Sequence, residues 1–168
     1  MRKKIFAFLL LSALYAGAQE VPDWENPIVV GINKEPYHAT LTLPSQKADC
    51  KEIISLNGKW RFQWSADPGK RPADFYKNDF NTDTWDTIIV PGAWQLQGYG
   101  KPIYSNVNYP FQKDAPKVTS EPPAEYYSYG HRNPTGSYVT TFEVTPDMKD
   151  KCLYLHFEGV KSAMYVWV

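Results

Sequence analysis

The residues best suited to chemistry in this chain gather between Pro91 and Phe111, in a stretch rich in aromatic rings, amides, glycine and proline. Aromatic faces stack on the apolar side of sugar rings, and Asn and Gln amides offer donors and an acceptor that match neighbouring hydroxyl groups. The aromatic residues are Trp94, Tyr99, Tyr104 and Tyr109. The stretch indicates carbohydrate binding. The alternative is a buried connection between two strands, because Pro and Gly mark loops and aromatic rings fill cores.

Other reactive side chains form no recognisable constellation. The carboxylates that could act in catalysis, such as Glu121, Glu125 and Glu158, stand in no recognisable catalytic sequence motif, so no catalytic residue is assigned within this chain. The remaining metal-ligating types lack the spacing of a transition-metal site: His38, His131, His156, Cys50 and Cys152. Whether the two cysteines pair is left open by their distance in the sequence.

The elements that must position the aromatic stretch read as β-strands. Residues 55–64 place Trp60, Phe62 and Trp64 at every second position, which predicts a strand with one buried face, and residues 85–90 form a short β-branched run. Alternating apolar residues predict further strands over 137–144 and 153–157, and another beginning at 164. The chain is expected to be all-β.

The first residues read as a targeting segment. Basic residues at positions 2–4, an apolar run over 5–14 and small residues at 16–18 predict a signal peptide over 1–18 and a secreted or periplasmic protein. Residues 19–51 read as an extended arm, and residues 52–168 as one domain. Lys plus Arg and Asp plus Glu each number 18, which gives no basic face for nucleic acid.

Short strands separated by Pro- and Gly-rich turns favour a β-sandwich of the jelly-roll or galactose-binding type. The sequence ends at Val168 within an apolar run, and too few strands are predicted to close a jelly roll of eight strands. The sandwich is therefore expected to be incomplete at its C-terminal end.

Several motifs give this chain a family resemblance. They follow one another in the order Asp23-Trp24-Glu25-Asn26-Pro27, 55–62 (SLNGKWRF), Val90-Pro91, Trp94-Gln95, Gly98-Tyr99, 102–110 (PIYSNVNYP), 133–138 (NPTGSY) and 157–160 (FEGV). Together they resemble the N-terminal domain of the glycoside hydrolase family 2 β-galactosidases over nearly all of the mature chain.

The resemblance implies a glycosidase that removes terminal non-reducing β-D-galactose, with both catalytic glutamates on a later domain, so this chain alone is expected to be inactive. By the same resemblance Asn106, with Val107 beside it, reaches the active-site opening and contacts the galactose. The alternative for Asn106 is an Asx-turn that satisfies its own backbone.

The resemblance also implies a peripheral Mg²⁺ near Asp23, Asn26 and the Val29 carbonyl, and leaves Na⁺ open as a second ion. Oxygen ligands of this kind suit Mg²⁺. The alternative is that Trp24 simply pins the arm to the sandwich.

Expected partners are a β-galactoside, later domains of the same polypeptide and a second copy of the chain, with neither nucleic acid nor membrane. Two other functions stay open at this point. One is a carbohydrate-binding module without catalysis, and the other is a family 2 enzyme with another sugar preference, such as a β-glucuronidase or a β-mannosidase.

Overall fold

A computed structural model describes residues 21–36, 53–102, 115–118, 133–161 and 163–168. Within these ranges the regular elements are three strands and four short 3₁₀ helices: η1 (Asp23–Glu25), β1 (Gly58–Ser65), η3 (Pro68–Lys70), β2 (Asp86–Val90), η4 (Trp94–Gln97), β3 (Thr135–Val139) and η6 (Pro146–Met148). Among the described residues, no helix has both the length and the apolar character to cross a membrane. The expected all-β class is confirmed.

The three strands form one antiparallel sheet in the order β2-β1-β3. On β1 the alternation expected from the sequence is observed, because Phe62 is fully buried while Arg61 and Gln63 on either side are exposed. Phe62 lies opposite Tyr138 of β3. The adjacent position on the same face, Trp60, lies opposite Ile88 of β2, which is also buried.

Aromatic rings surround the buried Phe62 under this face. The Phe62 ring centroid lies 4.7 Å from that of Tyr99, 4.8 Å from that of Tyr138 and 6.2 Å from that of Trp94. Rings at these separations in tilted or edge arrangements pack favourably beyond the area that they bury. Phe62 therefore holds the sheet and the segment after β2 together.

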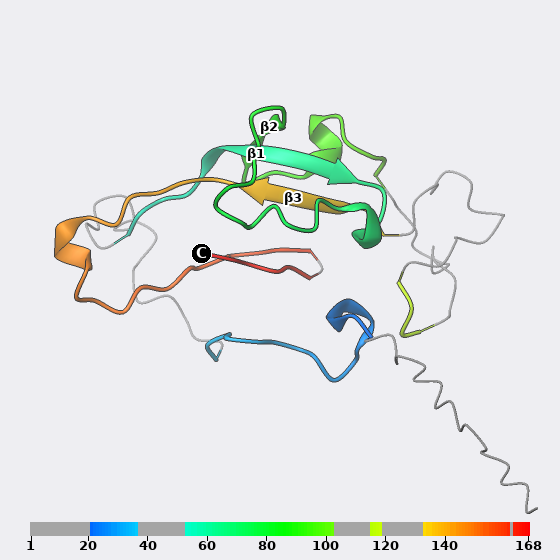
Figure 1. The fold of residues 1–168 in the computed structure, drawn as a ribbon, viewed down its shortest axis with the longest axis horizontal. Helices are drawn as coiled ribbons and strands as arrows, with labels where there is room; N and C mark the ends of the chain where they lie inside the picture. The colour runs from blue at the N-terminus through cyan, green and yellow to red at the C-terminus, as the bar shows by residue number, and fades with distance from the viewer. Residues whose placement is uncertain (1–20, 37–52, 103–114, 119–132, 162) are drawn as a thin grey trace, which may run out of the picture.

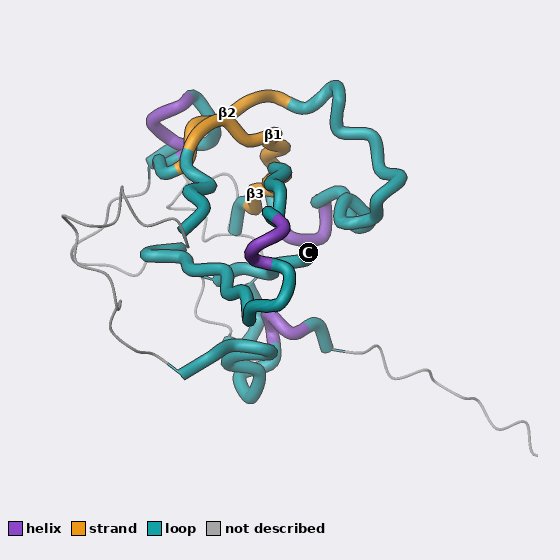
Figure 2. The backbone as a smooth tube through the Cα atoms, turned by 90° about the vertical axis from the view of Figure 1, so that its left-hand side faces the viewer, coloured by secondary structure: helices purple, strands orange, loops and turns teal. Residues whose placement is uncertain are grey.

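The chain after β3 forms a second layer. Figures 1 and 2 show its extended segments lying beneath the sheet, with the N-terminal arm on their far side. The two layers meet where Trp167 stacks on Tyr76 at 5.0 Å and meets Phe75 edge-on at 5.6 Å, both from the connection between β1 and β2. A sheet covered by a second extended layer is consistent with a β-sandwich.

The strand boundaries differ from those expected over the C-terminal half. The strand expected over 137–144 begins earlier, at Thr135, and ends at Val139, and no strand is assigned at 153–157 or 164–168 within the described residues. Alternation identifies a face but gives the backbone no partner, and a strand needs a hydrogen-bonded neighbour. Leu153 and Leu155 are accordingly exposed.

Candidate functional site

The first half of the aromatic stretch is fixed to the sheet. After β2, η4 runs over Trp94–Gln97 and ends at Gly98 with φ 97°, a left-handed conformation that glycine adopts without strain. The rings of Trp94 and Tyr99 then turn inward onto Phe62. Trp94 and Tyr99 are half-buried and pack on the core residue Phe62, so for these two rings the structure favours a packing role over ligand binding.

The side chain of Gln97 binds the free edge of β2. Its Oε1 accepts a hydrogen bond from the Ile89 N–H at 2.8 Å, and its Nε2 donates to the Ile89 carbonyl at 3.0 Å. A Cβ added at Gly92 would lie 2.8 Å from Gln97 Nε2 and 2.9 Å from the Ile89 carbonyl oxygen, so glycine leaves room for this contact. The amide thus takes the place of a neighbouring strand and covers an edge that would otherwise be open to pairing.

The stretch passes close to Trp64 at Gly100. Gly100, with φ 65°, brings its backbone against this indole, since an added Cβ would lie 3.3 Å from Trp64 Nε1. Pro102 is the last described residue before the gap. Asn106 and Val107 lie outside the described residues, as do Tyr104 and Tyr109, so the substrate contact expected at Asn106 stays a prediction.

The surroundings of Tyr99 raise the pKa of its phenol. Burial raises the pKa of its phenol above the ordinary value of 10.0, and a hydrogen bond to Asp86 and the negative charge of that carboxylate raise it further. The phenol is therefore neutral at physiological pH. It serves as a polar group that ties the connection to the beginning of β2, rather than as a base.

The N-terminal turn holds the residues expected to bind a metal. In η1 the Asn26 N–H donates to the Asp23 carbonyl at 3.0 Å, and the Asn26 side-chain Oδ1 accepts from the Ile28 N–H at 3.1 Å. The Val29 N–H donates to the Asn26 carbonyl at 3.1 Å. Asp23, Asn26 and Val29 thus lie at the ends of two consecutive turns, which together form the N-terminal turn, and Asn26 Oδ1 keeps a second lone pair.

The atoms of this turn that could ligate a metal ion suit a hard cation by their type. All of them are oxygens, which Mg²⁺ prefers as ligands. No three His, Cys, Asp or Glu side chains gather into a metal-binding group within the described ranges. The further ligands of such an ion would have to come from other parts of the protein, and the metal site stays a prediction.

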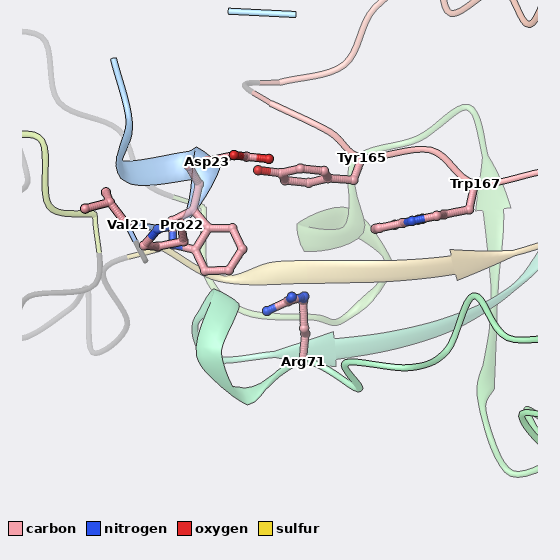
Figure 3. Close-up of a pocket in the computed structure, with 7 residues that line it drawn as sticks. Val21, Pro22, Asp23, Arg71, Tyr165 and Trp167 are labelled. Carbon is pink, nitrogen blue, oxygen red and sulfur yellow. The ribbon is translucent and has the colours of Figure 1, made fainter. Parts of the chain in front are cut away.

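A pocket of about 390 Å³ opens between the turn and the C-terminal layer, lined by Val21, Pro22, Asp23, Trp24, Arg71, Tyr165 and Trp167. Figure 3 shows the Asp23 carboxylate directed toward the Tyr165 phenol, with Arg71 approaching from the opposite wall. Burial, followed by the Asp23 charge, raises the pKa of Tyr165, and the Arg71 charge opposes this increase.

Trp24 joins the arm to both layers. The Arg71 guanidinium lies 4.8 Å from its ring centroid, within the range of a cation–π contact, and Tyr165 meets it edge-on at 6.3 Å. The alternative interpretation of the first motif, in which Trp24 pins the arm, is therefore supported. It does not compete with the metal prediction, which concerns the oxygen atoms of the same turn.

Three residues make contacts that the sequence does not indicate. Gln97 lies in none of the quoted motifs. Gly136 and Glu25 lie in two of them, but the motifs do not indicate that Gly136 packs against three rings or that Glu25 accepts a hydrogen bond from a residue 93 positions away. A pattern of alternating residues identifies a face, but it contains no information on which distant segment will meet that face.

Comparisons with known proteins identify one family and several similar proteins. The model of the family "Glycosyl hydrolases family 2, sugar binding domain" matches residues 53–168. A beta-galactosidase of Priestia megaterium is 39% identical over 163 residues, which cover 91% of this chain and 15% of that protein. A beta-galactosidase of Clostridium acetobutylicum is 39% identical over 87% of the chain and 16% of its own length.

A third relative is named as the large subunit of a beta-galactosidase. The beta-galactosidase large subunit of Lactobacillus acidophilus is 40% identical over 120 residues, or 68% of this chain and 19% of that protein. The chain thus spans less than a fifth of the length of each of these three relatives.

Proposed function

This chain belongs to glycoside hydrolase family 2, whose sugar-binding domain it matches from residue 53 to residue 168, and from that premise we propose that it is the N-terminal part of a β-galactosidase. The proposed reaction is hydrolysis of terminal non-reducing β-D-galactose. The observation that carries the proposal is the similarity to proteins named beta-galactosidase over up to 91% of the chain.

In this proposal the chain contributes substrate binding. The Asn106 amide hydrogen-bonds a galactose hydroxyl, and Val107 lies beside it. A contact of this kind needs a rigid support, because a small displacement of a binding group weakens its interaction with the substrate. At the beginning of the stretch this support comes from Trp94 and Tyr99, which pack on Phe62, and from Gln97, which binds the edge of β2.

The bond cleavage itself is proposed to occur on groups beyond this chain. Retaining glycosidases use two carboxyl groups about 5–5.5 Å apart, one as nucleophile and one as acid and base. Binding energy from groups that do not react can be used to orient the sugar for that step. The role proposed for this domain is therefore orientation of the galactose ring.

The metal belongs to the same proposal. Asp23, Asn26 and the Val29 carbonyl would hold a Mg²⁺ ion together with ligands from elsewhere in the protein, and Na⁺ stays open as a second ion. A divalent cation at this position would supply positive charge that fixes the N-terminal turn. The oxygen-only donor set and the shared turn support this assignment.

The proposal is tested on the complete polypeptide that carries this sequence. Purified protein is assayed with matched chromogenic β-galactoside, β-glucuronide and β-mannoside, and kcat/KM is compared. We expect the β-galactoside to be preferred by at least tenfold. Preference for the β-glucuronide or the β-mannoside would contradict β-galactose as the substrate and would identify that other sugar instead. Binding of galactose without turnover of any of the three substrates would indicate a carbohydrate-binding module.

A further inference from the structure

The pocket of about 390 Å³ between the N-terminal turn and the C-terminal layer has walls of aromatic side chains. Tyr165 and Trp167 are two positions apart, and their rings stack at 5.9 Å with an interplanar angle of 20°. The Trp24 ring stands at 89° to that of Tyr165, with 6.3 Å between the centroids. Tyr165 and Trp167 are each 46% exposed, so aromatic surface that borders the pocket stays accessible to a ligand.

Two opposite charges flank these rings. Figure 3 shows the Asp23 carboxylate and Arg71 on opposite sides of the pocket. Burial raises the pKa of Tyr165 most, the Asp23 charge raises it further, and the Arg71 charge lowers it, so both charged groups lie close to this phenol. Within the described part of the chain, however, no ion pair joins Asp23 to Arg71. The two charges therefore remain available on two sides of the pocket.

The three polar groups offer different hydrogen-bonding capacities. A carboxylate only accepts, a guanidinium only donates through its five N–H groups, and a phenol does both. Arg71 Nη1 donates to the Pro68 carbonyl at 2.7 Å, which fixes this side chain and leaves further N–H groups for a ligand. Asp23 has two carboxylate oxygens, so one can bind the proposed Mg²⁺ while the other faces the pocket.

This combination matches a neutral sugar ring. A sugar hydroxyl both donates and accepts, so neighbouring hydroxyls can bond to Asp23, Tyr165 and Arg71 together. The apolar side of the ring can pack on the exposed aromatic surface. A simple anion would be repelled by Asp23, and a simple cation by Arg71. The volume lies near the lower end of the range for ligand pockets, about 300–1,000 Å³, which suits a small saccharide.

We propose that this pocket binds a neutral saccharide. Its hydroxyl groups hydrogen-bond to Asp23, Tyr165 and Arg71, and its apolar side contacts the rings of Tyr165 and Trp167. The site goes beyond the proposed function, because it binds a sugar without cleaving it. Its test is independent of turnover, since binding is measured with sugars that a β-galactosidase does not cleave.

The test uses the complete polypeptide, with the methyl α-glycosides of glucose, mannose and galactose as probes and alanine as a small zwitterion. Ligand-detected NMR gives each Kd, and crystals soaked with the tightest probe give its position. Tyr165→Phe removes the hydroxyl and keeps the ring, and Arg71→Lys keeps the charge but removes the planar guanidinium. Tyr154→Phe is the matched control, because Tyr154 is exposed in the same layer and does not line the pocket.

We expect at least one glycoside to bind saturably in solution and to occupy this pocket in the crystal. Tyr165→Phe and Arg71→Lys should each raise its Kd roughly 2- to 12-fold, the equivalent of one net hydrogen bond. Tyr154→Phe should match the wild type. Because Tyr165→Phe keeps the ring contacts, it should retain the wild-type melting temperature, and it allows the test to proceed if Arg71→Lys fails to fold.

Density in the pocket without saturable binding in solution would mean binding at crystal concentration only, and would overturn the proposal. A pocket filled by a later segment of the polypeptide would overturn it too, as would a Kd that Tyr165→Phe leaves unchanged. Binding of alanine but of none of the glycosides would replace the saccharide by a zwitterionic ligand. None of these results affects the proposed function, which the chromogenic substrates test separately.

Discussion

At the scale of single residues, Gly136 has the most restricted surroundings among the described glycines. A Cβ at this position would lie 2.7 Å from Phe62 Cε2, 2.8 Å from Trp94 Cζ3 and 2.9 Å from Tyr138 Cε2. Atoms in a close-packed core cannot move aside freely, so three rings would have to shift together. The glycine of the Asn-Pro-Thr-Gly motif is thus explained by packing.

Gly136→Ala is predicted to destabilise the domain by about 1–3 kcal/mol, the usual cost of overpacking a filled core. Gly159→Ala is the matched control, because a Cβ added at Gly159 would meet no atom within 4 Å. Thermal unfolding of both variants checks the prediction. Equal melting temperatures for Gly136→Ala and the wild type would mean that the three rings can separate without cost.

A pH dependence follows from Tyr99. Burial, then Asp86, raises the pKa of this phenol in the folded state above the ordinary 10.0. As the pH rises past the unfolded value, the unfolded chain loses the proton first, so the stability is fully present below about pH 10 and is lost as the pH approaches the folded value.

Tyr99→Phe keeps the ring on Phe62 and removes the titrating group. Its melting temperature should therefore fall less than that of the wild type between about pH 9 and pH 11, since the other tyrosines titrate in both proteins. The measurement is a series of unfolding curves across this range. Parallel losses in the two proteins would show that Tyr99 does not contribute to alkaline destabilisation.

At the scale of elements, the Gln97 side chain covers part of the outer edge of β2. Gln97 satisfies both the N–H and the carbonyl of Ile89, which is 48% exposed. Gln97→Ala should cost about 1 kcal/mol, because a partly hydrated peptide group loses two hydrogen bonds but regains water. The unfolding free energies of Gln97→Ala and of the control Gln95→Ala should differ by this amount. Equal values would contradict a stabilising role for the Gln97 hydrogen bonds to Ile89.

The elements also show what can be predicted from the sequence. β1 and β2 are predictable because Trp60, Phe62 and Ile88 carry a clear alternation or β-branched run and lie on one face of the sheet. Leu153 and Leu155 carry the same alternation, yet they lie in an extended segment without an assigned strand. The pattern is a local property, whereas pairing depends on a second segment of the chain.

The same limit applies to the candidate site. The sequence indicates carbohydrate binding for the aromatic stretch as one unit, whereas in the structure its first two rings, Trp94 and Tyr99, pack on Phe62. Types of residue in a motif predict what a segment can bind. They do not predict which of its rings the core will use.

At the scale of the whole molecule, the described residues form one arm, one sheet and one further layer, which are connected by aromatic contacts through Trp24 and Trp167. This arrangement suits a domain that orients a binding segment within a larger enzyme. Contacts of Trp94, Tyr99 and Gln97 fix the beginning of the aromatic stretch, and the proposed catalytic pair would have to come from another part of the polypeptide.

Export is a prediction at the same scale. The basic start, the apolar run and the small residues at 16–18 predict cleavage after Ala18, so the mature protein should begin at Gln19. Intact-mass measurement and N-terminal peptide mapping of protein recovered outside the cytoplasm check this. Recovery of protein that still carries Met1 would contradict secretion or periplasmic export.

The central claim, that this domain contributes a direct substrate contact to a β-galactosidase, is tested most directly by kcat/KM of Asn106→Ala in the complete polypeptide. Loss of the amide leaves a galactose hydroxyl without its partner, and we expect kcat/KM to fall about 5- to 150-fold, the equivalent of about 1–3 kcal/mol, with an unchanged melting temperature. Asn108→Ala, two positions along the same segment, should retain wild-type kinetics. Wild-type kcat/KM in Asn106→Ala would contradict the proposed substrate contact.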